Sequence, residues 1–259
     1  MRFESFAASD PGLVRQANED SLLALEEQGL FLVADGMGGL SRGDVASRIA
    51  VETVERFVKA SRKEDITWPI KPQEQYSMEE NRFLAAISMA NWNVYSEFLK
   101  NDKNSAMGTT LVGLLVDGEK MVVTNVGDSR AYLIRDSVIQ QVTDDHSLVM
   151  EEVRKGTMTR EEARHHPQKH VINRALGISE VARVDISSVV VQEEDLFLLC
   201  SDGLSDMLSD KEILDIARSY MDKPLKEMGE GLILAANEKG GRDNVSVVLV
   251  RLHDDGTKP

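Results

Sequence analysis

The chain has 259 residues, of which 42% are hydrophobic and 29% are charged, as in globular proteins with a substantial core. Its formal net charge of −14 disfavours nucleic acid and anionic membrane surfaces as partners, and no apolar run approaches the roughly 18 residues of a membrane-spanning helix. The first residues lack the features of a secretion signal and Cys200 is the single cysteine, so we expect a cytoplasmic protein without internal disulfides.

Short apolar segments bounded by Gly, Asp and Asn predict antiparallel strands along most of the chain. In chain order these segments are 3–9, 21–27, 29–35, 108–118, 120–126, 129–136, 181–191, 195–201 and 244–252. The Asp117-Gly118 pair between two of them is typical of a hairpin turn.

Helical spacing of apolar residues occurs in both halves of the chain. Two amphipathic helices are predicted within 45–58 and 83–98. Later in the chain, Ser209 and Glu212 have the spacing of a helix-starting capping box, and a last helix is predicted over 225–241. Helices that bracket runs of antiparallel strand predict a layered α+β fold, and no linker requires a second domain.

Two apolar strands lead into an Asp-Gly pair, in "LFLVADGMGG" from residue 30 and "LFLLCSDGLSD" from residue 196. A buried carboxylate is costly unless it is paired, so Asp35 and Asp202 need an amide, a basic side chain or a metal ion. The flexible backbone at Gly36 would let a carbonyl oxygen act as a further ligand. More acids stand at predicted junctions of loop and strand: Glu19, Asp20, Asp128 and Asp243.

Carboxylates without clustered His or Cys ligands favour hard cations such as Mg²⁺ or Mn²⁺. Asp-Gly is also a common turn dipeptide, so on the residues alone a metal site and ordinary turns remain about equally favoured. A cysteine-dependent phosphatase is excluded because Asp206 stands where an arginine is needed after Cys200. A dinucleotide-binding loop is disfavoured because Ser41 replaces its last glycine.

A series of motifs resembles the type 2C, metal-dependent serine/threonine protein phosphatases and extends to about residue 252. The motifs follow the family's order, and the glycine-rich "DGMGG" resembles the bacterial branch. They are "RQANEDS", "VADGMGG", "GTTLVGLLV", "NVGDSRAYLI", "VTDDHS", "HPQKHVINRALG", "LLCSDGLSDML" and "GRDNVSVVLV". The resemblance implies a four-layer α-β-β-α sandwich in one catalytic domain over 1–254, with a flap at about 147–175 and a tail at 255–259.

The resemblance also implies roles for individual residues. Asp35 and the Gly36 carbonyl, with Asp202 and Asp243, match the ligands of two Mn²⁺ or Mg²⁺ ions. Asp20 matches an acid that holds metal-bound water, and Glu19 is a candidate to share that task. Asp128 matches a ligand of a third, weaker ion shared with Asp202, and Arg15 matches the guanidinium that binds the substrate phosphate. A hydroxide that bridges the two metals would attack phosphoserine or phosphothreonine directly.

Some residues depart from this pattern or leave it open. Met37 stands where many eukaryotic members have a histidine proposed as general acid, so a metal-bound water and His146 are the candidate proton sources. Within the flap, a predicted short helix begins at a Thr159–Glu162 capping box. Three flap histidines, His165, His166 and His170, favour a solvated surface over a zinc site, and Arg174 is a further candidate phosphate contact.

The resulting hypothesis is a phosphatase acting on phosphoproteins, with a bacterial Ser/Thr kinase or its targets as partners and no need for more than a monomer. A phosphoprotein-binding regulatory module of the same fold with weak turnover is the alternative. A metal phosphoesterase for small molecules is a third hypothesis.

Overall fold

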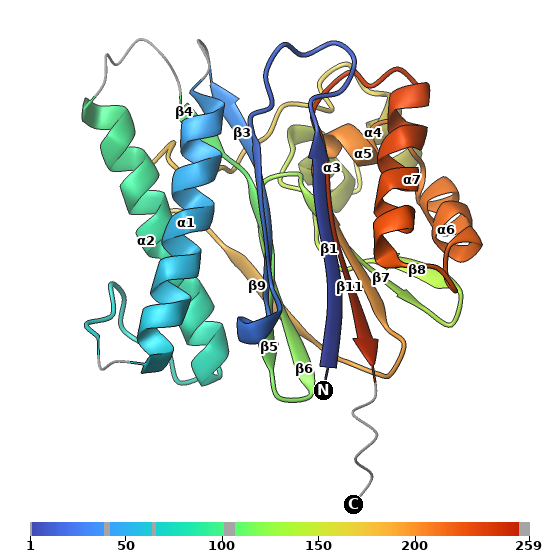
Figure 1. Cartoon of the computed structure of the whole chain (residues 1–259). Helices are drawn as coiled ribbons and strands as arrows, with labels where there is room; N and C mark the ends of the chain where they lie inside the picture. Colours follow the sequence, from blue (N-terminus) through green and yellow to red (C-terminus); the bar gives the residue numbers. More distant parts are fainter. Residues whose placement is uncertain (1, 39–41, 64–65, 101–106, 254–259) are drawn as a thin grey trace, which may run out of the picture.

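The computed structural model describes residues 2–38, 42–63, 66–100 and 107–253. Over these residues the chain forms four layers, in which two antiparallel sheets face each other and helices cover both outer faces (Figure 1). This architecture confirms the predicted α+β sandwich. The predicted tail at 255–259 lies outside the described residues, as do Gly39 and Ser41 of the glycine-rich loop.

The two sheets are built from strands far apart in the chain. The described part of one sheet has the order β1-β11-β10-β7-β8, with bounds β1 Arg2–Asp10, β11 Val245–His253, β10 Leu196–Cys200, β7 Arg130–Arg135 and β8 Val138–Gln141. The other has the order β2-β3-β5-β6-β9, with β4 paired to β3 and bounds β2 Asp20–Leu25, β3 Leu30–Gly38, β4 Met107–Thr109, β5 Leu111–Asp117, β6 Lys120–Val126 and β9 Asp185–Val190. The first and last strands, β1 and β11, pair along their whole lengths.

Helices cover the outer face of each sheet because every one of these helices has an apolar face that packs against the sheet. Helices α1 (Gly43–Lys63) and α2 (Met78–Lys100) pack on the β3 sheet, and α6 (Asp210–Ser219) and α7 (Leu225–Glu238) pack on the β10 sheet. A third apolar core fills the space between the sheets, with Phe31 and Phe197 fully buried in it. The shorter helices are η1 Glu26–Gln28, α3 Leu148–Arg154, α4 Arg160–His165 and α5 Asp202–Ser205.

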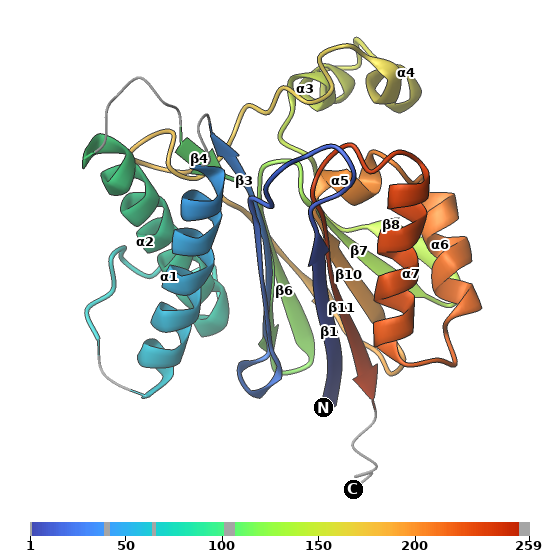
Figure 2. The same ribbon diagram turned by 45° about the horizontal axis from the view of Figure 1, so that its top comes forward.

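The predicted flap contains α3 and α4, which project beyond one end of the two sheets (Figure 2). The capping box at Thr159 and Glu162 is confirmed, as is the one at Ser209 and Glu212 that begins α6. The flap helices therefore lie over the end of the sandwich at which several of the candidate acids lie.

The predicted local structure was wrong at three places. The strand that was predicted to end at Asp35 continues as β3 to Gly38, because residues 107–109 supply a further pairing partner, β4. The predicted strand 108–118 is accordingly divided into β4 and β5, and β8 was not predicted at all. Asp35-Gly36 is thus extended backbone and not a turn.

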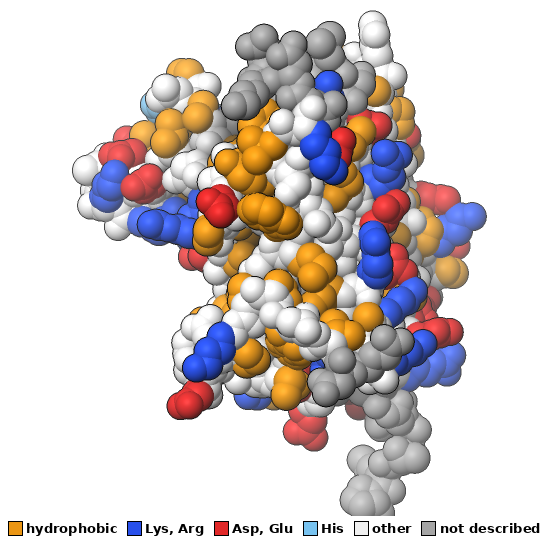
Figure 3. Space-filling view, turned by 90° about the vertical axis from the view of Figure 1, so that its left-hand side faces the viewer, with side chains coloured by type: hydrophobic (Ala, Val, Ile, Leu, Met, Phe, Trp, Pro, Cys, Tyr) orange, Lys and Arg blue, Asp and Glu red, His pale blue; other side chains and the backbone are white. Residues whose placement is uncertain are grey.

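The outer face formed by α1 and α2 carries apolar as well as charged side chains (Figure 3). On α2, Trp92 is 50% exposed and Leu99 45% exposed. In the part of the chain that the structure describes, no helix combines the length and the hydropathy that crossing a membrane requires.

Candidate functional site

The candidate acids converge at one end of the sandwich. Asp20 and Asp35 are direct partners in the register between β2 and β3. Asp202 opens α5 immediately after β10, Asp243 lies just before β11, and Asp128 lies in the turn from β6 to β7. Both sheets therefore contribute to one site. A single cleft is lined by most of the predicted residues: Arg15, Glu19, Asp35, Gly36, Asp128, Asp202 and Asp243.

The backbone at Gly36 lies so close to neighbouring carbonyl groups that there is no room for a side chain. A Cβ atom there would lie 2.1 Å from the carbonyl oxygen of Gly43 and 2.4 Å from that of Glu19. The Gly36 N–H donates to the Glu19 carbonyl at 3.2 Å, and the Glu19 carboxylate accepts from the Gly43 N–H at the start of α1, also at 3.2 Å. Glycine is required here because the first helix begins directly against β3.

Two threonines fix the backbone of Asp35. The Asp35 N–H donates to Thr110 Oγ1 at 3.0 Å, while the Asp35 carbonyl accepts from the Thr109 hydroxyl and the Thr110 N–H, both at 2.8 Å. Thr110 also hydrogen-bonds the hydroxyl of Ser129, beside Asp128, at 2.7 Å. Sequence reasoning assigned these threonines no role, although two polar residues inside the apolar run "GTTLVGLLV" were a usable signal.

Asp20 lies behind the cleft, buried between the two sheets. Its Oδ2 accepts from the hydroxyls of Ser201 at 2.9 Å and Ser246 at 2.6 Å, whereas its Oδ1 is buried without a hydrogen-bond partner among the described residues. Burial, with the charges of Asp202 and Asp243, raises the pKa of Asp20 to about 7. An unpaired buried carboxylate oxygen is costly, so this atom needs a ligand that the described residues do not provide.

The other acids of the cleft repel one another in the same way. Burial and then the charges of Asp20 and Asp202 raise the pKa of Asp35 well above its usual range. Burial likewise raises the pKa of Asp128, and it raises the pKa of Asp202 to about 6 although a hydrogen bond from Asp35 opposes the shift. A divalent cation among these oxygens would neutralise the repulsion, so the donor set fits Mg²⁺ or Mn²⁺.

Arg15 lies at the mouth of the cleft, where its side chain is 55% exposed and forms an ion pair with Asp243 at 2.6 Å between Nη2 and Oδ2. That hydrogen bond raises the pKa of Arg15. Because much of the guanidinium stays accessible to solvent, it can meet an anion that enters the cleft.

The structure gives His146 a position that does not suit a proton donor to substrate. It is fully buried, its Nδ1 accepts from the Gly127 N–H at 3.1 Å, and its Nε2 lies 3.0 Å from Asp185 Oδ2. A ring that accepts at Nδ1 carries its proton on Nε2 and donates it to Asp185. Burial lowers the pKa of His146, and Arg174 binds the same Asp185 at 2.6 Å. His146 thus braces the turn that carries Asp128.

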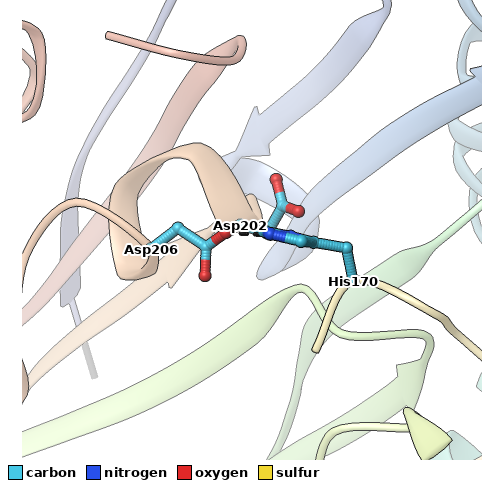
Figure 4. Close-up of side chains that lie close together, drawn as sticks. All are labelled: His170, Asp202 and Asp206. Carbon is cyan, nitrogen blue, oxygen red and sulfur yellow. Dashed lines mark ion pairs between the residues drawn. The ribbon is translucent and has the colours of Figure 1, made fainter. Parts of the chain in front are cut away.

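Of the three flap histidines, only His170 reaches the cleft. Its Nδ1 lies 3.1 Å from Asp206 Oδ2, and a ligand atom from each of His170, Asp202 and Asp206 falls within 4.8 Å of the others (Figure 4). Lys169 Nζ lies 2.9 Å from the other Asp206 oxygen, whereas His165 pairs with Glu161 on the exposed face of α4. Sequence reasoning did not place Asp206 in the site, although its spacing of four residues from Asp202 puts it on the same helical face.

Comparison with known proteins agrees with this geometry. The family model described as protein phosphatase 2C matches residues 14–247. The chain is 38% identical over 250 residues to the serine/threonine phosphatase stp of Listeria monocytogenes, covering 93% of each chain, and 34% identical over 226 residues to the protein phosphatase PhpP of Streptococcus pneumoniae, covering 87% of each.

Solved structures show the same fold. The serine/threonine phosphatase PstP/Ppp of Mycobacterium tuberculosis superposes with a TM-score of 0.85 at 34% identity, over 98% of this chain and 100% of that one. The catalytic domain of PstP in complex with two manganese ions gives a TM-score of 0.82 at 33% identity, over 98% and 99% of the two chains. The sandwich with its acidic cleft is therefore that of a bacterial phosphatase. The chain belongs to the protein phosphatase 2C family.

Proposed function

We propose that the chain is a metal-dependent protein phosphatase that hydrolyses phosphoserine and phosphothreonine in proteins. The observation that carries this proposal is the convergence of five buried or half-buried aspartates on one cleft, with an Asp20 oxygen that has no hydrogen-bond partner among the residues that the structure describes. The named relatives are serine/threonine phosphatases, and one solved relative holds two manganese ions. A cleft of this kind suits a phosphate monoester only when cations offset its charge.

The residues present suit two divalent cations. Asp35, the Gly36 carbonyl, Asp202 and Asp243 would hold them, and Asp128 with Asp202 would hold a third, weaker ion. Such ions acidify bound water and neutralise charge on the phosphoryl group. Mn²⁺ or Mg²⁺ is the cofactor that we infer, because every proposed donor is an oxygen.

The chain's own groups then act on the substrate and on solvent. Arg15 binds the phosphoryl oxygens with its planar fork, which requires it to leave or share its contact with Asp243. Asp20, fixed by two serine hydroxyls, presents its free oxygen to solvent molecules held in the site. Asp35 is held in place by Thr109 and Thr110, so the site is formed before substrate arrives.

The test is hydrolysis of a phosphothreonine peptide in Mn²⁺ by the wild type and by Asp35→Ala. We expect turnover that EDTA abolishes and that the variant loses. Full activity in EDTA would refute metal dependence, and tight phosphopeptide binding without turnover would identify the regulatory module instead. A small phosphate monoester assayed in parallel distinguishes a phosphoesterase for small molecules, since that enzyme would show no preference for the peptide.

Several finer statements extend the same proposal. The physiological partners would be phosphorylated proteins, including a Ser/Thr kinase or its targets, in cytoplasmic signalling. We also propose one catalytic domain over 1–254, including the flap at 147–175, because one apolar core joins both sheets, and a monomeric state.

A further inference from the structure

A groove beside the flap differs in charge from the rest of this acidic protein. It lies between α3 and the segment 173–183, and we call it the flap groove. Its charged lining consists of four cations, Arg154, Lys155, Arg174 and Arg183, against one acid, Glu151. The cleft, in contrast, is lined by six carboxylates and three Lys or Arg side chains, in a chain with a net charge of −14. The flap groove therefore has a locally positive electrostatic potential, which attracts anions.

Two of these four cations are free to bind a ligand. Lys155 pairs with Glu152 at 3.0 Å and with Glu151 at 3.5 Å. Arg174 pairs with Asp185. Arg154 and Arg183 are exposed, and within the described residues neither forms an ion pair. A guanidinium without a partner is the group best suited to a carboxylate or phosphate from another molecule.

The groove also offers apolar contact on a backbone that is already ordered. Ile178 is 54% exposed and Val181 is 78% exposed, next to the basic side chains. The buried Asn91 of α2 donates to the carbonyls of Ser179 at 3.1 Å and Glu180 at 2.9 Å, which fixes this segment. A ligand would therefore bind with little loss of backbone entropy in the groove.

The flap groove adjoins the cleft. Ile172 lines the cleft and the next residue, Asn173, lines the groove, so the cleft and the groove lie on either side of the same chain segment. Met37 of the cleft and Ile178 of the groove also lie beside the same residue, Gly108. Both side chains have an atom within 4 Å of the position that a Cβ atom on Gly108 would occupy. A peptide whose phosphorylated residue occupies the cleft can accordingly place its flanking residues in the groove.

We propose that the flap groove is a docking site for an acidic stretch that flanks the phosphorylated residue of a protein substrate. Carboxylates of that stretch would pair with Arg154 and Arg183, and an apolar side chain would cover Ile178 and Val181. The inference rests on the proposed phosphatase function and adds a substrate preference to it: acidic phosphoproteins over neutral ones.

The experiment compares two phosphothreonine peptides with the same core, extended on both sides by about ten residues, which span up to about 33 Å each. One carries Glu and Asp in the extensions, and the other carries Gln and Asn. Exposed ion pairs contribute modestly, so we expect the acidic peptide to be about fivefold better in kcat/KM, mainly through KM, with the advantage lost at high salt. The double variant Arg154→Glu/Arg183→Glu should remove the preference.

A matched double variant controls for net charge. Arg56→Glu/Lys211→Glu makes the same change of charge at two exposed residues on α1 and α6, away from the groove, and should keep the preference. Equal rates for both peptides with the wild type, or equal loss in both double variants, would overturn the docking site. Turnover of p-nitrophenyl phosphate separates the two proposals, because it should survive in all these proteins. The absence of turnover of both p-nitrophenyl phosphate and the phosphothreonine peptides by the wild type would refute the phosphatase function itself.

Discussion

Replacing Asp20 by Asn should stabilise the metal-free protein while weakening its capacity to bind metal. The carboxyl is buried and one of its oxygens accepts hydrogen bonds from two serine hydroxyls, whereas the other has no partner in the described part of the chain. An asparagine keeps an oxygen acceptor for the serines and removes the charge. The buried negative charge is costly without a cation, so its removal favours the folded state.

The size of the effect follows from the pKa of Asp20, raised from 3.8 to about 7 in the fold. A raised carboxyl pKa stabilises the folded state at low pH, and this contribution is lost as the pH rises from about 4 to about 7. From pH 5.5 to pH 8 the wild type should therefore lose about 2 kcal/mol relative to Asp20→Asn. For a chain of this size that corresponds to about 4–8 °C in the melting temperature.

Thermal unfolding of EDTA-treated proteins at the two pH values provides the measurement. The gap between Asp20→Asn and the wild type should widen from pH 5.5 to pH 8, and Mn²⁺ should stabilise the wild type more than the variant. Asp215→Asn, with the same charge change at a side chain that is 56% exposed on α6, is the control and should show no such widening. A gap that is equal at both pH values would refute a raised pKa for the Asp20 carboxyl.

Three further outcomes are expected. Asp202→Asn should lower phosphopeptide turnover at least about 10²-fold and weaken Mn²⁺ binding in calorimetry, and unchanged manganese uptake would contradict its role as a ligand. Arg15→Lys should lower kcat/KM about 10- to 100-fold without loss of stability, because an ammonium cannot form the two parallel bonds that a phosphate accepts, so equal kinetics would exclude the clamp. His146→Gln keeps a donor towards Asp185 but not the acceptor for Gly127, whereas His146→Asn keeps that acceptor. If His146 positions Asp128, Mn²⁺ affinity should fall more in the Gln variant than in the Asn variant, and the reverse order would count against it.

Much of the fold could be predicted because local patterns agreed with tertiary structure. The strand β10 is a continuous apolar run and β11 is mostly apolar, and Ser209 and Glu212 mark the start of α6. Asp35 was placed at the end of a strand because the residues that extend β3, at 107–109, lie some seventy positions later in the chain. Pairing with a distant segment leaves no mark in the local sequence.

The candidate site also combines features that the local sequence indicates with features that depend on contacts between distant residues. Acids at the ends of apolar strands indicate a functional site from the sequence alone, because a carboxylate in such a position is costly unless it has a partner. The supporting contacts carry less: His146 resembles any lone histidine, and its two engaged nitrogens become evident only when Gly127 and Asp185 are brought beside it. Lys169 and Asp206 meet across a flap whose path the sequence did not predict.

The pairing of β1 with β11 has a consequence for biosynthesis. Arg2 lies opposite His253 and Asp10 opposite Val245, so β1 leaves the ribosome long before the strand with which it pairs. A polypeptide interrupted before residue 243 lacks one acid of the cleft and exposes the unpaired edges of β1 and β10 to other chains. The strand β11 must therefore be synthesised before the cleft can assemble with all its aspartates, so shorter fragments lack the complete site.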